Sequence, residues 1–197
     1  MSQRSEIELL SLFEKGNEKA YSYFYKLFVN DLYAYGISLG ANETAIKDVI
    51  QNIFFNIYSS DIHFESVKHL RYYLLRSMKH RIYDIFKSSS YTITDSLSDY
   101  ETMSFAVEAD VINDLISEEQ QQILKKKLNE MLSILTDRQR EAIYLRYTQE
   151  LEFEEIAQIL DMTIPASRKL VSRALKKLRD HYTSFYILAI LSSTIFK

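Results

Sequence analysis

The sequence has no cysteine, one proline and only three glycines in 197 residues. The lack of cysteine excludes a disulfide framework and a thiolate nucleophile, and it fits a reducing compartment. Glycine is the residue that tight hairpins and phosphate-binding loops require, so both have almost no material here. We therefore expect an all-α fold.

Residues that carry covalent chemistry are also scarce. The four histidines are scattered along the chain, at His63, His69, His80 and His181. No pair of carboxylates has the spacing of a metal site, which disfavours a nucleic-acid enzyme. We expect no enzymatic activity, no cofactor, no metal and no small-molecule substrate. The charged start, "MSQRSEIELL", lacks the apolar core of a signal peptide, so we expect a cytoplasmic protein.

Two blocks of helical periodicity are present, with an acidic segment between them. Apolar residues recur at spacings of three and four over residues 1–90 and again over 116–180. From Tyr91 to Glu119 there are eight acidic residues and no Lys or Arg. Such a segment buries too little apolar surface to fold alone. We expect two small helical domains joined by a flexible acidic linker at 91–115.

The stretch "DMTIPASRKLVSRALKKLR", from Asp161 to Arg179, contains the only proline. Thr163 can cap a helix whose first turn holds Pro165, where a missing N–H costs little. Shorter helices are expected before it, from Thr136 to about Tyr147 and from Phe153 to Leu160. A short helix, a tight turn and a second helix form a helix-turn-helix.

The helix after Thr163 has two distinct faces when its residues are projected at about 100° per residue. The expected core face comprises Ser167, Val171, Ala174 and Leu178. The opposite face comprises Arg168, Lys169, Ser172, Arg173 and Lys176. A cationic second helix is typical of DNA binding in the major groove. The alternative is an ordinary solvated basic helix.

A second cationic stripe lies on the helix expected from Lys68 to Lys87. The same projection places cations and aromatic rings within about 100° of one another, at Lys68, Tyr72, Arg76, Lys79, Tyr83 and Lys87. Cations can follow phosphates while rings stack on unpaired bases, so the stripe suggests a single-stranded nucleic acid. The alternative is that the tyrosines are half-buried packing residues.

The helix written "ETAIKDVIQNIFFNIY" has a broad apolar face. Its other face carries Asp48, Gln51, Asn52 and Phe55. A phenylalanine among polar residues suggests a protein-contact surface, although a single exposed apolar side chain is also common on proteins that contact nothing there.

Taken in order, these elements resemble a bacterial RNA polymerase sigma factor of the extracytoplasmic-function (ECF) subfamily, over roughly residues 15–180. The most specific parts are "AIKDVIQNIF" and "LTDRQREAIYLRY…EFEEIAQIL". The resemblance implies a transcription initiation factor that binds core RNA polymerase and promoter DNA. It implies a region 2-like domain at 1–90 and a region 4-like domain at 116–180.

The resemblance also implies a role for each surface. Core-polymerase binding falls on Asp48, Gln51, Asn52 and Phe55. Binding of the melted −10 element falls on Lys68, Tyr72, Arg76, Lys79, His80 and Tyr83. Binding of the −35 element falls on Arg168, Lys169, Ser172, Arg173 and Lys176. The chain departs from the family pattern at Asn52, His80 and Leu170, and it has Asp161 where glycine is frequent.

The apolar tail at 181–197 is shorter than the roughly 20 residues that span a membrane. It is either a last packed helix or a docking handle for a partner, and the resemblance adds an anti-sigma factor as a candidate partner. The alternative function for the whole chain is an autonomous helix-turn-helix regulator. Such a regulator would dimerise on palindromic sites and need no polymerase.

Overall fold

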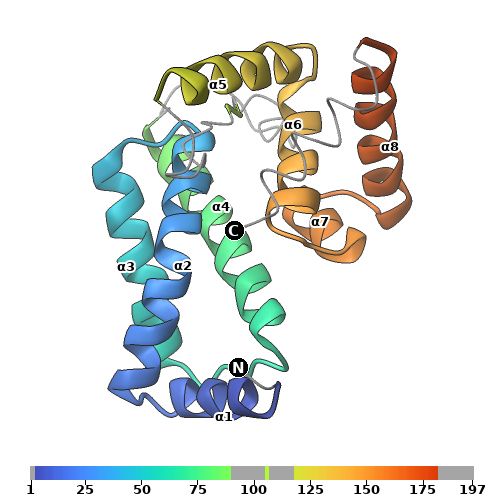
Figure 1. The fold of residues 1–197 in the computed structure, drawn as a ribbon. Helices are drawn as coiled ribbons and strands as arrows, with labels where there is room; N and C mark the ends of the chain where they lie inside the picture. The colour runs from blue at the N-terminus through green and yellow to red at the C-terminus, as the bar shows by residue number, and fades with distance from the viewer. Residues whose placement is uncertain (1–2, 90–104, 107–117, 182–197) are drawn as a thin grey trace. The chain divides into compact units, whose positions relative to one another are not determined.

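The computed structural model describes residues 3–89, 105–106 and 118–181 (Figure 1). Every regular element within these ranges is helical. The all-α expectation is therefore confirmed. The chain divides into two compact units, Met1–Thr102 and Met103–Lys197, and each is described by itself.

Among its described residues, the first unit has four helices, α1 (Gln3–Glu14), α2 (Glu18–Ser38), α3 (Glu43–Ser59) and α4 (Val67–Ser89). Asparagine caps two of them: the Asn17 side chain accepts from the Ala20 amide at 3.2 Å, and the Asn42 side chain accepts from the Ala45 amide at 2.9 Å. Glycines at positive φ, Gly16 at 73° and Gly40 at 83°, allow the chain to turn just before each cap. Short, capped turns thus connect α1 to α2 and α2 to α3.

Aromatic rings and one close helix crossing form the core of this unit. The ring centroids of Phe13 and Phe24 lie 5.1 Å apart, and both side chains are buried. A Cβ added at Gly36 of α2 would lie 2.8 Å from Ile46 Cγ1 in α3 and 2.6 Å from Met78 Cε in α4. Glycine therefore lets α2 approach α3 and α4 closely. The outer faces of α3 and α4 remain open to solvent on this packed support.

The second unit contains α5 (Glu118–Ser133), α6 (Asp137–Ile143), the π-helical segment η2 (Tyr144–Thr148), α7 (Phe153–Ile159) and α8 (Ile164–His181). Thr136 starts α6 with a capping box, because its hydroxyl accepts from the Gln139 amide while its own amide donates to Gln139 Oε1. We expected one α-helix from Thr136 to about Tyr147. The structure differs in the last turn, where the chain widens into η2.

Only two residues of the expected 91–115 linker are described, Phe105 and Ala106. The Phe105 side chain is 1% exposed and its ring lies 5.6 Å from that of Tyr144. This residue belongs to the packed interior of the second unit. The remainder of the expected linker lies outside the described residues, as does the expected tail beyond His181.

No helix in the described ranges is long and apolar enough to cross a membrane.

Candidate nucleic-acid and polymerase interfaces

The second helix of the helix-turn-helix, α8, begins as the sequence predicts. The Thr163 hydroxyl accepts from the Ala166 amide at 3.4 Å, and Pro165 lies in the first turn. The buried Ser167 hydroxyl lies 3.0 Å from the carbonyl oxygen of Phe153 in α7 and 2.8 Å from that of Ile164. This contact ties the start of α8 to the preceding helix.

The turn between α7 and α8 explains the preference for glycine that the family resemblance suggests. Asp161 has φ 49°, in the left-handed region that glycine occupies without steric cost. The next amide, of Met162, donates to the Ala157 carbonyl at 2.9 Å. This chain makes the tight turn with an aspartate, which tolerates the conformation better than most residues.

The two faces of α8 are placed as predicted. Its buried residues are Ser167, Val171, Ala174 and Leu178. The five residues of the predicted DNA-binding face are all exposed, namely Arg168, Lys169, Ser172, Arg173 and Lys176. We call these five residues the α8 cationic face. It has the arrangement that the second helix of a helix-turn-helix needs to enter the major groove.

One residue of the α8 cationic face is restrained by α7. Arg168 Nη2 lies 3.2 Å from Glu154 Oε1, and Arg168 Cζ lies 5.5 Å from the ring centroid of Phe153. Arg146 Cζ lies 4.9 Å from the same ring, and its Nη1 donates to the Leu151 carbonyl at 2.7 Å. Sequence reasoning missed this cluster. Its only signal was "EFEE" in the first turn of α7, which supplies a ring and carboxylates beside a basic helix.

The stripe predicted on α4 is only partly open to solvent. Lys68, Arg76, His80 and Lys87 are exposed and Tyr83 is half-buried. Tyr72 and Lys79, however, are only 8% and 4% exposed. The expected continuous surface of cations and rings is therefore wrong at these two positions.

The burial of Tyr72 and Lys79 follows from their place on the helix. At about 100° per residue, both lie within about 60° of Leu75, which belongs to the core. The stem of a lysine can pack along apolar neighbours. The Tyr72 hydroxyl accepts from Arg76 Nη1 at 2.9 Å, and its ring stacks on His69 with centroids 6.2 Å apart.

The most exposed side of α4 is rotated about the helix axis relative to the predicted stripe. Arg76, His80 and Lys87 lie within about 40° of one another on it. Sequence reasoning missed His69 and Tyr73, which are half-exposed on the same arc. The helical projection alone could have found them.

The outer face of α3 is exposed as predicted. Asp48, Gln51 and Asn52 are exposed, and the Phe55 side chain is 62% exposed. Tyr58, which was not predicted, is 57% exposed one turn later. We call these five residues the α3 outer face. It is polar at its N-terminal end and aromatic at its C-terminal end.

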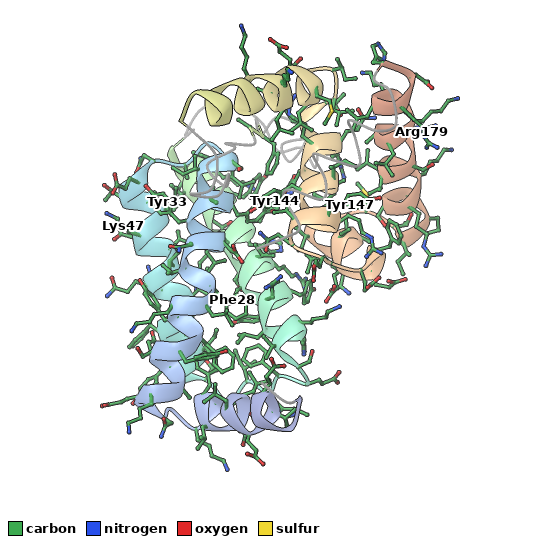
Figure 2. All side chains as sticks on the ribbon, in the orientation of Figure 1. Phe28, Tyr33, Lys47, Tyr144, Tyr147 and Arg179 are labelled. Carbon is green, nitrogen blue, oxygen red and sulfur yellow. The ribbon has the colours of Figure 1, made fainter. Side chains whose placement is uncertain are left out.

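Beside this face, α2 and α3 border a shallow hollow of about 480 Å³. Its lining includes Tyr33 of α2 and Lys47 of α3, which Figure 2 labels, together with Gln51 of the α3 outer face. Lys47 also pairs with Glu43, and this hydrogen bond lowers the pKa of the glutamate. Partial burial raises the pKa of Tyr21, which lines the same hollow, and electrostatic interaction with Tyr25 raises it further.

Among the described residues, no group of three or more His, Asp or Glu side chains could hold a metal ion. What the site residues offer is exposed charge and exposed rings. Their arrangement suits binding to a polyanion and to a protein partner.

Comparison with known proteins agrees with this arrangement. Residues 125–178 match the family described as Sigma-70, region 4. The chain is 25% identical over 162 residues to the ECF RNA polymerase sigma factor SigM of Bacillus subtilis (strain 168), covering 80% of this chain and 92% of that protein. Its fold is similar to that of CnrH, solved in complex with the cytosolic domain of CnrY, with a TM-score of 0.55, 18% identity and coverage of 89% and 95% of the two chains. Residues 125–178 therefore belong to the Sigma-70 region 4 family, and the chain as a whole is similar to an ECF sigma factor of RNA polymerase.

Proposed function

We propose that this sigma factor directs core RNA polymerase to promoters through three separate surfaces. The α8 cationic face contacts the −35 duplex, the exposed arc of α4 holds the opened −10 strand, and the α3 outer face docks on the polymerase. The observation that carries the proposal is the α8 cationic face, whose four cations are all exposed on the second helix of a helix-turn-helix.

At the −35 element, Arg168 and Arg173 are the side chains best suited to read bases. An arginine can donate two hydrogen bonds to one guanine edge. Lys169 and Lys176 suit phosphate contacts, which add affinity without selecting sequence. Ser172 lies between these cations on the exposed side of α8 and can donate to either a base or a phosphate.

At the −10 element, the residues that reach the opened strand are those on the exposed arc of α4. Arg76, His80 and Lys87 supply charge or hydrogen-bond donors, and Tyr83 supplies a half-exposed ring. Lys68 extends the positive charge toward the start of the helix. Tyr72 supports this surface indirectly, because its hydroxyl holds Arg76. Lys79, with its side chain 4% exposed, supports the helix rather than the strand.

The α3 outer face has the mixture that protein interfaces favour, with aromatic rings beside a few polar groups. Phe55 and Tyr58 can bury apolar area, while Asp48, Gln51 and Asn52 can fix orientation. The hollow that begins at Gln51 can take a side chain from the polymerase.

The charge balance suggests why the factor needs the polymerase. The whole chain has a formal net charge of −3 at pH 7. Non-specific affinity for DNA comes from neutralised phosphates, so a chain of this charge binds DNA weakly by itself. Core polymerase supplies the missing affinity and places both DNA-binding surfaces on one promoter.

We further propose that the factor acts in the cytoplasm, where RNA polymerase and promoters are found, and that a protein partner holds it inactive. The relative CnrH was solved in complex with the cytosolic domain of CnrY. By analogy, an anti-sigma factor would cover the α3 outer face or one of the DNA-binding surfaces of this chain.

The proposal is tested with a promoter fragment, the purified chain and core polymerase in a gel-shift titration. We expect a tight, heparin-resistant complex only when both proteins are present. Tight binding of the chain alone to palindromic sites, as a dimer, would contradict the proposal and support an autonomous regulator.

A further inference from the structure

We propose that Phe153 is a positioning residue for reading the −35 element, because its ring holds the Arg168 guanidinium in place for a guanine edge. Phe153 of α7 contacts both Ser167 and Arg168 of α8. Arg146 of η2 lies over the same ring. The promoter consequence rests on the proposed function, whereas the positioning itself can be measured on the free protein.

Two successive residues of α8 contact Phe153, one at its backbone and one at its ring. The buried Ser167 hydroxyl lies 3.0 Å from the Phe153 carbonyl oxygen. Arg168 Cζ lies over the ring, 5.5 Å from its centroid. Because Ser167 and Arg168 are adjacent in the chain, the backbone contact fixes the start of α8 against α7 and brings the Arg168 side chain to the ring.

The backbone of Phe153 is fixed by the start of α7. Phe153 is the first residue of this helix. The amide of Glu152, the residue before it, donates to Glu155 Oε2 at 2.8 Å, so a side chain of the first turn satisfies a backbone group at the helix start. The ring therefore extends from a well-defined backbone position.

A second cation fixes the ring itself. Arg146 Cζ lies 4.9 Å from the ring centroid. Its Nη1 donates to the Leu151 carbonyl at 2.7 Å and to Glu152 Oε2 at 3.1 Å. Among the described residues, the cations over the Phe153 ring are thus Arg146 and Arg168. The Arg146 side chain is 28% exposed and that of Arg168 is 61% exposed, so Arg168 is the one that DNA can reach.

The ring and the Glu154 carboxylate restrain Arg168 in different ways. Arg168 Nη2 donates to Glu154 Oε1 at 3.2 Å, so the carboxylate competes with DNA for the same N–H groups. An aromatic ring attracts a cation through its face. The N–H donors of a guanidinium lie in its own plane and point away from its centre. Phe153 therefore keeps its contact with Arg168 while the edge of the guanidinium donates to DNA.

A restraint that persists in the complex acts on base specificity. Guanine presents two acceptors, N7 and O6, in the major groove, and an arginine binds both only when its guanidinium edge is correctly oriented. An arginine that is already held in one orientation loses less conformational entropy on binding, and it fits fewer alternative bases. Phe153 thus raises the preference for guanine at the −35 position that Arg168 reads, and not at positions read by other residues.

A double-mutant cycle between Phe153 and Arg168 tests the positioning. Phe153→Leu keeps an apolar side chain but removes the ring, whereas Phe153→Tyr keeps a ring. Each full-length variant, with core polymerase, transcribes templates that carry every base in turn at each −35 position. Phe153→Leu should lower the preference for guanine at one position by about two- to fivefold, as expected for a cation–ring contact at an exposed site. Phe153→Tyr should retain the preference.

Two arginine variants complete the cycle. In an Arg168→Ala background, Phe153→Leu should cause no further loss of preference, because the ring then holds no arginine that reads DNA. In an Arg173→Ala background, which leaves Arg168 in place, the full loss should remain. An unchanged preference in Phe153→Leu, or an equal loss when Arg168 is already absent, would overturn the positioning role.

Relaxation of the arginine Nε–H groups, measured by ¹⁵N NMR on the free full-length chain, tests the contact without altering Phe153. The signals are assigned by their loss in Arg168→Lys and Arg173→Lys. Arg168 Nε should have a higher order parameter than Arg173 Nε, and the difference should persist in Glu154→Gln. Equal order parameters of the two arginines in Glu154→Gln would overturn the ring contact.

Failure of the proposed function would give a different result. Core polymerase with the unmodified chain would then transcribe none of the templates, and the relaxation measurement would still decide the ring contact. If transcription occurs but Arg168→Ala leaves every −35 preference unchanged, this arginine reads no base. That result would overturn the positioning role and leave the other surfaces of the proposed function intact.

Discussion

The Arg168 guanidinium lies 3.2 Å from the Glu154 carboxylate, so a residue of the α8 cationic face is already paired in the free protein. The Arg168 side chain is 61% exposed and the Glu154 side chain is 50% exposed. Exposed pairs of this kind contribute roughly 0.2–1 kcal/mol. A DNA phosphate can therefore compete with Glu154 for the guanidinium at small cost.

Removing the Glu154 charge should strengthen binding to the −35 element. Glu154→Gln eliminates both the competing pair and the repulsion between its carboxylate and DNA. We expect a gain of up to about fivefold in affinity at low salt, which shrinks as salt rises. Fluorescence anisotropy of the polymerase complex on a −35 fragment provides the measurement. Glu150→Gln, which makes the same charge change in the loop before α7, is the control. A loss of affinity in Glu154→Gln would show that the glutamate orients Arg168 for binding.

Truncating the arginines of the α8 cationic face should weaken promoter selection. Arg168→Ala or Arg173→Ala removes a group that can read a base edge, at a cost of roughly 1–3 kcal/mol in discrimination. Transcription from promoters randomised at the −35 element measures the change, and core binding should stay intact. The assignment fails if the double variant keeps the original −35 preference. Lys176→Ala, a phosphate-contact control, should weaken all promoters evenly.

The turn before α8 offers a stability prediction. Asp161 has φ 49°, so Asp161→Gly relieves a conformational cost of about 1 kcal/mol. For a unit of this size, that gain raises the melting temperature by about 4–8 °C. Asp161→Ala should lower it, because alanine tolerates this conformation less well than aspartate. Calorimetry on both variants decides, and equal melting temperatures would count against strain at this turn.

Charge reversal on α3 should prevent docking on the polymerase. In Asp48→Arg, a cation replaces an exposed carboxylate, which adds repulsion to the loss of a complementary contact. The fold should survive because Asp48 lies opposite the buried face of the helix. A pull-down of core polymerase, with circular dichroism on the same sample, provides the measurement. Glu65→Arg reverses an exposed charge in the loop before α4 and should bind normally. Normal polymerase binding by folded Asp48→Arg would remove this residue from the docking surface.

The all-helical fold and the orientation of α8 were predictable because they depend on local rules. The cap at Thr163, the proline in the first turn and the apolar period are all written in adjacent residues. The exposure of Phe55 followed from the same period in α3. The roles assigned to these exposed residues stay predictions.

Features that depend on tertiary contacts were not predictable in this way. Lys79 and Tyr72 lie at the border of the buried side of α4, where a helical projection cannot distinguish a covered position from an open one. The Phe105 backbone is hydrogen-bonded to Asp137 and Arg140, which are more than thirty residues away in sequence. Composition alone assigns Phe105 to the acidic linker at 91–115.

The central claim, that this chain directs RNA polymerase to promoters, is tested most directly by mapping transcript start sites. Genomic DNA of the source organism is transcribed by its core polymerase with and without the purified chain. We predict a limited set of start sites that requires the chain, shares −35 and −10 elements and is lost with Asp48→Arg. An identical pattern of start sites with and without the chain would contradict the account.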